Sequence, residues 1–324
     1  MGITDLRAVA AIETVERMDL DAGVAAVDAA NWLYRYLNPV VQYTDESVYT
    51  TADGREVPNL VGLVQGLPKF LEADLVPAFV FDGDVPDLKS AELARRAEQN
   101  RAAAAAAAAA EEAGDEERAA RLRARAQRLT DVMWETTTGL LDALGLPVLS
   151  APAEAEAQAA HVARRGDAAY AVTEDYDALL FGAPRTLRQF TSSGPVEVMD
   201  LDETLDANDL TREQLVAVAV LCGTDYNEGV SGVGPATALS LVREHGTLEA
   251  ALAARDATVP DADEICDLFV NPPVTDGYDL AVPDTLDVAA ARSYVVDEWE
   301  VDADELERGF SRLADWERTG GRSR

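Results

Sequence analysis

The sequence has very few of the residues that most often carry nucleophilic or zinc chemistry. Among 324 residues there are two cysteines, Cys222 and Cys266, and two histidines, His161 and His245. Two distant cysteines cannot form a disulfide framework or a zinc site, so we expect a reducing compartment. A histidine-activated nucleophile is also disfavoured. Any chemistry must therefore depend mainly on carboxylates.

No long hydrophobic run is present either. Every apolar stretch is shorter than the roughly 20 residues that a membrane-spanning helix needs. The start, Met1-Gly-Ile-Thr-Asp-Leu6, does not resemble a signal peptide, and Leu6 stands where myristoylation requires Ser or Thr. We therefore expect a soluble cytoplasmic protein with no membrane partner.

Lysine is almost absent, whereas acids are abundant. All but two of the 27 basic residues are arginines, the exceptions being Lys69 and Lys89, and 60 acidic residues give a net charge of -33. This composition is typical of cytoplasmic proteins of salt-accumulating halophiles, in which molar salt screens charge repulsion beyond a few ångströms. The overall charge therefore does not exclude a nucleic acid partner, although an acidic protein that avoids nucleic acids stays a possible reading.

Short apolar runs that end in acids recur along the chain. They cover residues 23–27, 77–81 and 168–172, and helical patterns lie between them, for example at residues 59–74 and 130–144. Alternating strands and helices predict an α/β fold, with a mostly parallel central sheet covered by helices on both faces. The chain is long and apolar enough for one elaborate domain, or for two that share an interface.

Acids gather at one edge of this predicted sheet, at the carboxyl ends of the strands, where open α/β sheets bind ligands. Glu154 and Glu156 are expected in the first turn of a helix after Pro152, where the helix dipole alone would explain either one. Six carboxylates together repel one another and need protons, bases or metal ions, and hard oxygen ligands favour Mg²⁺ or Mn²⁺. The six are Asp28, Asp82, Glu154, Glu156, Asp175 and Asp177.

Residues 88–130 differ in composition from the rest of the chain. They hold nine consecutive alanines, Ala102–Ala110, and nine bases against seven acids. High helix propensity predicts two exposed helices hinged near Gly114-Asp115. A solvated helical hairpin explains the pattern, but the reversed local charge favours an element that faces a polyanion. Lys89 and Arg96, two helical turns apart, would project from one face and could hold a phosphate, or could simply be solvated.

A second loop pattern lies at residues 221–236. Asp225 follows an apolar helix that ends near Cys222, and a glycine-rich loop leads into Pro235, a favourable first helical residue. Backbone amides at such a helix start can hold phosphate, although a plain turn between helices explains the pattern equally. Tyr34, six residues after Asp28, could stack on a base or belong to the core.

These motifs together resemble those of the flap endonucleases, structure-specific 5′ nucleases with a PIN-like α/β fold, in a haloarchaeal version. The resemblance covers about residues 1–269. Its motifs occur in family order: Val27-Asp28-Ala29 with Asn31-Trp-Leu-Tyr34, Val80-Phe-Asp-Gly83 with Leu88-Lys-Ser-Ala-Glu-Leu-Ala-Arg-Arg96, Ala151-Pro-Ala-Glu-Ala-Glu156, Thr173-Glu-Asp-Tyr-Asp177, and Gly223-Thr-Asp-Tyr226 with Gly232-Val-Gly-Pro235.

The resemblance implies a role for each matching residue. Two Mg²⁺ ions, for which Mn²⁺ can substitute, would be bound by Asp28, Asp82, Glu154, Glu156, Asp175, Asp177 and Asp225. The catalytic set would be Lys89, Arg96, Asp28, Asp82, Glu154 and Asp175. The substrate would contact Tyr34, Lys89, Arg96, Glu154, Asp225, Gly232 and Gly234. Glu174 matches no ligand position and is expected to be a solvated or supporting acid.

The resemblance also implies a domain organisation. Residues 1–87 and 131–260 would form the nuclease core, residues 88–130 an arch over a single-stranded 5′ flap, and residues 261–324 an acidic C-terminal region. Within the core, a helix-two-turn-helix at 212–246 would hold duplex DNA, with a K⁺ ion. Ala236 replaces a lysine that is usual in the family, so phosphate contacts there would depend on amides and a bound cation. The last residues lack a clamp-binding segment, so the sliding clamp stays an open partner.

The expected function is two-metal hydrolysis of a DNA phosphodiester at the base of a 5′ flap, in replication and repair. Two alternatives stay open. A related 5′-3′ exonuclease or bubble-cutting nuclease would share the same active site. A non-catalytic DNA-junction binder would keep the fold without the reaction.

Overall fold

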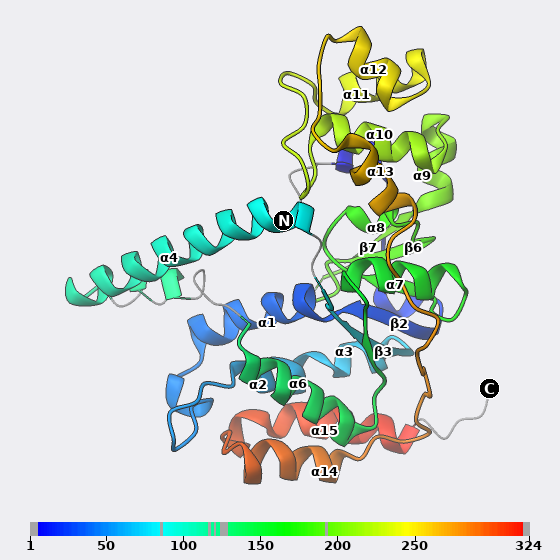
Figure 1. Cartoon of the computed structure of the whole chain (residues 1–324). Coiled ribbons are helices and arrows are strands. Elements are labelled where there is room, and N and C mark those ends of the chain that lie inside the picture. The colour runs from blue at the N-terminus through cyan, green and yellow to red at the C-terminus, as the bar shows by residue number, and fades with distance from the viewer. Residues whose placement is uncertain are drawn as a thin grey trace.

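The computed structural model describes residues 6–84, 87–115, 118–119, 121–123, 129–191 and 194–319. In this part of the chain, a seven-stranded sheet with the order β1-β7-β6-β5-β2-β3-β4 runs through the centre of the molecule (Figure 1). Helices cover both of its faces. The predicted α/β class with a mostly parallel sheet is confirmed.

The strands beside the predicted site are parallel. They are β2 (Gly23–Asp28), β3 (Leu75–Phe81), β4 (Val148–Ser150), β5 (Tyr170–Val172) and β6 (Arg185–Arg188). Only the far edge is antiparallel, where β7 (Val196–Asp200) pairs with both β6 and β1 (Ala11–Val15). The apolar runs predicted at 23–27, 77–81 and 168–172 thus correspond to β2, β3 and β5.

Alternation along the strands creates two cores. On β2, Ala26 belongs to one core, whereas its neighbours Ala25 and Val27 belong to the other, because successive side chains point to opposite faces. The core around Ala26 is covered by α7 (Ala155–Arg164), α8 (Asp177–Leu180), α9 (Leu201–Asn208), α10 (Arg212–Cys222), α11 (Pro235–His245), α12 (Leu248–Ala254) and α13 (Ala262–Val270). The opposite core is covered by α1 (Ala29–Tyr43), α2 (Pro58–Gly66), α3 (Pro68–Glu72), α6 (Asp131–Leu144), α14 (Val288–Arg292) and α15 (Ala303–Thr319).

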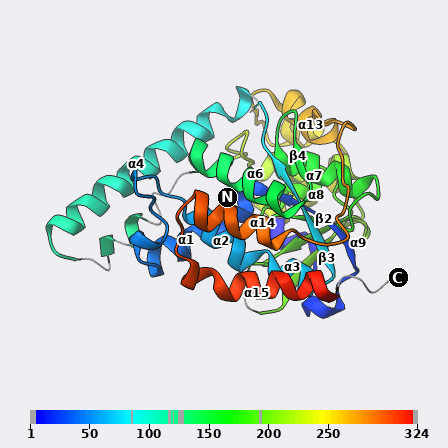
Figure 2. The ribbon, with the colours of Figure 1, turned by 90° about the horizontal axis from the view of Figure 1, so that it is seen from below.

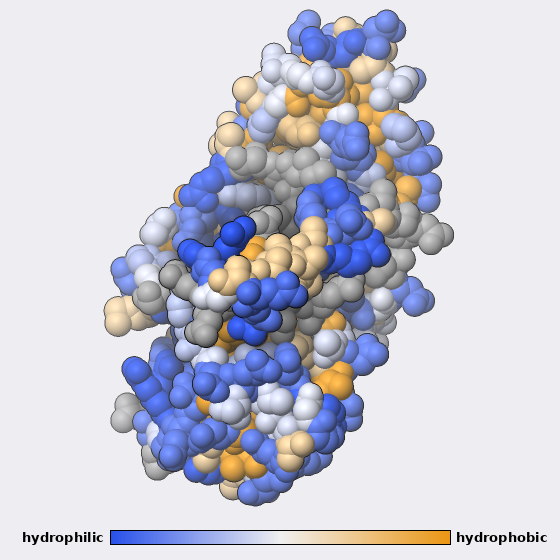
Figure 3. All heavy atoms as spheres, turned by 90° about the vertical axis from the view of Figure 1, so that its left-hand side faces the viewer, coloured by the Kyte–Doolittle hydropathy of each residue, from blue (hydrophilic) through white to orange (hydrophobic). Residues whose placement is uncertain are grey.

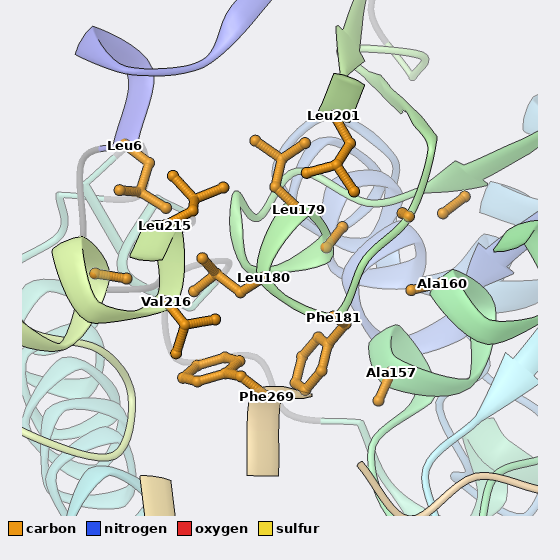
Figure 4. Close-up of a cluster of buried hydrophobic side chains, with 14 of the residues drawn as sticks. Leu6, Ala157, Ala160, Leu179, Leu180, Phe181, Leu201, Leu215, Val216 and Phe269 are labelled. Atoms are coloured by element: carbon orange, nitrogen blue, oxygen red, sulfur yellow. The ribbon is translucent and has the colours of Figure 1, made fainter. Parts of the chain in front are cut away.

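The first core joins the sheet to the helices at one end of the molecule. In Figure 4, Phe181 after α8 faces Phe269 of α13, with Leu180 and Val216 beside them, and the two phenyl centroids are 5.1 Å apart. Figure 1 shows α10 to α13 together at this end and α14 and α15 at the opposite end. The helices α10 and α11 are therefore anchored to the sheet by apolar contacts.

Helix boundaries follow local chemistry and correct two predictions. The helix expected over 59–74 is divided, because Pro68 cannot continue a helix and instead begins α3 after α2 has ended at Gly66. Glu154 is the N-cap of α7 rather than a first-turn residue. The predicted helix at 130–144 forms as α6, which Thr130 caps by accepting a hydrogen bond from the Met133 amide at 3.2 Å.

The alanine-rich segment forms α4 (Ser90–Glu112), which projects from the body (Figures 1 and 2). The predicted hinge is present, because Gly114 adopts a left-handed conformation with φ of 75° directly after the helix. The prediction of a fully exposed helix is wrong, because Ala103, Ala107 and Ala110 are buried along one side of α4. The return segment lies partly outside the described residues, but Arg123 pairs with Glu111 at 2.9 Å.

The remaining described elements are short. They are the 3₁₀ turns η1 (Leu6–Ala8), η2 (Arg17–Asp19), η3 (Glu46–Val48) and η4 (Asp87–Lys89), and the π-helical segment η5 (Ser293–Glu298). On the side from which α4 projects, hydrophilic residues cover most of the described surface (Figure 3). Among the described helices, none has both the length and the apolar character needed to cross a membrane.

Candidate active site

The sheet brings the predicted acids together because its central strands end level with one another. Asp28 is the last residue of β2 and pairs with Val80 of β3, while Val27 pairs with Val172 of β5. Asp82 follows β3 directly, and the segment with Asp175 and Asp177 follows β5. Acids far apart in the sequence therefore share one edge, as the alternating pattern predicts.

Asp28 has both a structural and an electrostatic position. Its carboxylate caps α1 by accepting a hydrogen bond from the Asn31 amide at 3.0 Å. Burial, together with the nearby charge of Asp82, raises the pKa of Asp28 to about 8. The group therefore has a high affinity for a proton or another cation.

Asp82 joins β3 to the helix that carries the glutamates. Its carboxylate accepts a hydrogen bond from the Ala155 amide at 2.8 Å, at the start of α7. The backbones also meet, since the Gly83 amide donates to the Ala153 carbonyl at 2.7 Å. A β-carbon on Gly83 would lie 2.1 Å from the Ala151 carbonyl oxygen, so only glycine allows this approach.

Glu154 is the centre of a group of hydrogen bonds. One of its oxygens pairs with the Lys89 ammonium, and the other accepts a hydrogen bond from the Tyr226 hydroxyl. The same ammonium lies 3.6 Å from a carboxylate oxygen of Asp225. Burial opposes the charge of Lys89, but Glu154 and Asp225 outweigh it and raise the pKa of Lys89 above its usual value. Sequence reasoning gave Tyr226 no role, although it directly follows Asp225.

The remaining acids surround Asp175. Burial, and then the charge of Asp175, raises the pKa of Asp177 to about 7 and that of Glu156 well above its usual value. One carboxylate oxygen of Glu156 is buried and has no hydrogen-bond partner. All seven predicted acids interact electrostatically with at least one other member of the set.

The acids gather, but among the residues that the structure describes no group of three His, Cys, Asp or Glu residues is arranged to hold a metal ion. Several of their oxygens are instead bound by protein donors. Those donors are Asn31, Lys89, Ala155 and Tyr226. The donor chemistry still fits a hard divalent cation, because the oxygens are anionic, crowded and partly without a hydrogen-bond partner.

The other predicted site residues belong to α1, to α4 and to the loop before α11. Tyr34 on α1 is 39% exposed, so its ring is available at the surface rather than enclosed in the core. Gly232 has a φ of 76°, and Gly234 is the N-cap of α11 with no side-chain cap, directly before Pro235. Arg96 belongs to α4, but its side chain is outside the described part of the structure.

Glu174 is a supporting acid rather than a solvated one. Its carboxylate pairs with Arg35 at 2.9 Å and accepts a hydrogen bond from the Gln189 amide at 2.8 Å. Behind it, Arg188 binds the Glu174 carbonyl at 3.0 Å and the buried Glu197 at 3.0 Å. No local motif marks Arg188 or Glu197, so sequence reasoning missed this support.

Without divalent ions, stability is expected to fall as the pH rises from about 5 to about 8.5. The folded pKa values are about 8 for Asp28 and about 7 for Asp177, above the ordinary value of 3.8. Raised carboxyl pKa values stabilise the fold while the groups are protonated, and this contribution is lost as the pH passes the folded values.

The measurement is the thermal midpoint in EDTA and high KCl at several pH values. Asp177→Asn should flatten the fall below about pH 7, and added Mg²⁺ should raise the midpoint most at high pH. A midpoint that rises steadily to about pH 8.5 would contradict this account.

The chain is similar to known proteins along most of its length. The model of the XPG N-terminal domain matches residues 1–103, and that of the XPG I-region matches residues 145–225. Flap endonuclease 1 of Haloarcula marismortui is 55% identical over 317 residues, which cover 97% of each chain. The structure of flap endonuclease-1 from Methanococcus jannaschii is 28% identical, with a TM-score of 0.75, over 98% of this chain and 99% of that one. The catalytic core of Rad2 in complex with DNA substrate has a TM-score of 0.69 at 22% identity, over 94% and 95% of the two chains.

Proposed function

The chain belongs to the family of flap endonuclease 1, the structure-specific 5′ flap endonucleases, and we propose that its reaction depends on Mg²⁺ held by the seven gathered acids. The observation that carries the proposal is the gathering of these acids, whose charges repel one another. Asp28 ends β2, Asp82 and the segment with Asp175 follow β3 and β5, the Asp82 carboxylate accepts a hydrogen bond from the first amide of α7, and Lys89 lies between Glu154 and Asp225. Repulsion of this kind is relieved by protons or by cations. At neutral pH and millimolar Mg²⁺, a divalent cation is the natural partner.

The residues present fit such an ion. The buried Glu156 oxygen has no hydrogen-bond partner, and Asp28, Asp177 and Glu156 all have raised pKa values. We propose the full set of ligands as Asp28, Asp82, Glu154, Glu156, Asp175, Asp177 and Asp225, acting directly or through water. Two bound ions would supply an activated water and stabilise the leaving 3′ oxygen, with Mn²⁺ as a substitute for Mg²⁺.

The chain's own residues would position the DNA. Lys89 carries a positive charge beside Glu154 and Asp225, where it would stabilise negative charge on the scissile phosphate. Arg96, two turns further along α4, is proposed to act with it. The exposed ring of Tyr34 would stack on a nucleotide near the scissile bond. No protein nucleophile is needed in this reaction.

Duplex binding is proposed for the two helices α10 and α11. The loop between them contains Gly232 and Gly234 and leads into Pro235, so backbone amides rather than lysines would face phosphate, with a K⁺ ion nearby. Rad2, a structural neighbour, was solved in complex with DNA substrate. We infer branched DNA with a 5′ flap as the substrate.

The domain boundaries remain as inferred from the sequence. We assign residues 1–87 and 131–260 to the nuclease core, 88–130 to the arch and 261–324 to the acidic C-terminal region. We propose a cytoplasmic location, as expected from the sequence.

The test is cleavage of a labelled 5′-flap DNA in high KCl while the Mg²⁺ concentration is varied. We expect a product cut near the flap junction, saturable dependence on Mg²⁺, and no cleavage in EDTA. A nicked duplex and a bubble substrate separate the alternatives, because an exonuclease releases short products from the nick. Equal cutting of a blunt duplex, or full activity in EDTA, would refute the proposal.

A further inference from the structure

Asn31 connects two of the segments that carry the gathered acids. It lies in the first turn of α1, directly after Asp28. Its side-chain amide nitrogen donates to a carboxylate oxygen of Asp175 at 3.1 Å, and its side-chain oxygen accepts from the Glu174 amide at 3.0 Å. Its backbone amide donates to Asp28 at 3.0 Å. One residue therefore contacts the ends of both β2 and β5.

We propose that Asn31 is a positioning residue, which holds the Asp175 carboxylate in a fixed orientation relative to Asp28 and thereby increases the affinity of the site for divalent ions. The inference rests on the proposed metal-dependent function. It adds a residue that none of the predicted sets contains. Asn31 would act through Asp175 and Asp28, without touching the ion or the DNA.

The chemistry of the amide suits this position. A neutral amide can donate to a carboxylate without adding charge to a site that is already crowded with acids. An Asp at this position would repel Asp175, and a Lys would compete with a divalent ion for it. Because the amide engages one oxygen of Asp175, the other oxygen keeps its free lone pairs for a ligand bond. Hydrogen bonds of this kind to metal-binding carboxylates typically change metal affinity by about 10- to 100-fold.

A second contact shows that α1 holds the segment after β5 at two points. One helical turn after Asn31, Arg35 pairs with the Glu174 carboxylate at 2.9 Å. The Asp175 amide is also bound, by the Thr173 hydroxyl at 3.2 Å. The backbone around Asp175 is thus fixed by other contacts, and the amide of Asn31 is the contact that orients its carboxylate.

The simpler reading is that Asn31 only links α1 to the neighbouring segment and contributes to stability. The two readings differ in what they predict for metal binding. A structural link would change the thermal midpoint of the metal-free protein, and metal affinity would change only as far as the fold is lost. A positioning residue changes metal affinity in a protein that is still folded.

The experiment compares the full chain with Asn31→Ala and Asn31→Leu. Leu keeps the branched shape and the helix but removes both side-chain hydrogen bonds. The matched control is Asn271→Ala, because the Asn271 amide also donates to an aspartate, Asp267, at 2.8 Å, on the exposed surface of α13. Metal affinity is measured without DNA by calorimetric titration with Mn²⁺. Flap binding in Ca²⁺ and the thermal midpoint in EDTA are measured in parallel.

We expect both Asn31 variants to bind Mn²⁺ about tenfold more weakly, to bind flap DNA within about twofold of the parent, and to recover cleavage at higher metal concentration. The Asn271 control should match the parent. Unchanged Mn²⁺ affinity in a folded Asn31 variant, or loss of folding in both variants, would overturn the proposal. If the parent itself binds no divalent ion, the proposed metal-dependent function fails. If the parent binds Mn²⁺ and the folded variants bind it equally well, only the role of Asn31 fails.

Discussion

Replacement of Asp175 by Asn is expected to reduce flap cleavage about a thousandfold while flap binding is retained. Asp175 interacts electrostatically with Asp28, Glu156 and Asp177, so its charge is central to the proposed site. Asn has the shape of Asp and can still accept the hydrogen bond from Asn31, so the substitution removes only the negative charge of the side chain. Removal of one repelling charge should also leave the metal-free protein as stable as the parent or more stable.

Single-turnover cleavage of 5′-flap DNA in high KCl and saturating Mg²⁺ measures the effect. Binding of the same DNA in Ca²⁺ and the thermal midpoint in EDTA complete the comparison. Asp267→Asn is the matched control, because Asp267 also accepts a hydrogen bond from an asparagine amide but is exposed on α13 and belongs to none of the predicted site sets. Cleavage within about tenfold of the parent would remove Asp175 from the active site.

Lys89→Met is expected to lower the cleavage rate about a hundredfold. Met keeps the unbranched length of the side chain but removes the charge that lies between Glu154 and Asp225. Since the ammonium and a divalent ion neutralise the same acids, Mn²⁺ affinity should be unchanged or higher in this variant. That pattern is the opposite of the one expected for a lost metal ligand.

The chain provides its own control for this change. Lys69 is the other lysine, and it donates to the Thr191 carbonyl from α3, outside the group of acids. Lys69→Met should leave the cleavage rate near that of the parent. If Lys89→Met cuts normally at saturating DNA and Mg²⁺, the ammonium has no part in the chemical step.

The sequence was sufficient for the fold and for the place of most acids. Apolar runs that are followed by Asp28, by Asp82 and by the segment with Asp175 predict parallel strands whose ends meet, and the sheet has this form. The glycine before Pro235 likewise predicts the start of α11, and the apolar run to Cys222 predicts the end of α10. These features depend on local pattern, which a sequence displays directly.

Contacts between distant segments could not be predicted in the same way. Glu154 binds Lys89 and Tyr226, which are 65 and 72 residues away in the sequence, and either acid oxygen could have found another donor. The support of Glu174 by Arg35 and Arg188 has the same origin. Such pairings are decided by packing of the whole domain, so the local motif only shows that an acid is present.

The backbone contact at Gly83 has a consequence for evolution. Because the Gly83 amide donates to the Ala153 carbonyl and the Asp84 amide donates to the Pro152 carbonyl, the two ends of the excursion that carries α4 and α6 are held together at its base. An excursion pinned at its base can grow, shrink or simplify to a run of alanines without displacing the acids on either side, since lengthening a closed loop costs little. Related proteins should therefore differ more in the length and composition of this excursion than in the spacing between Glu154 and Asp177.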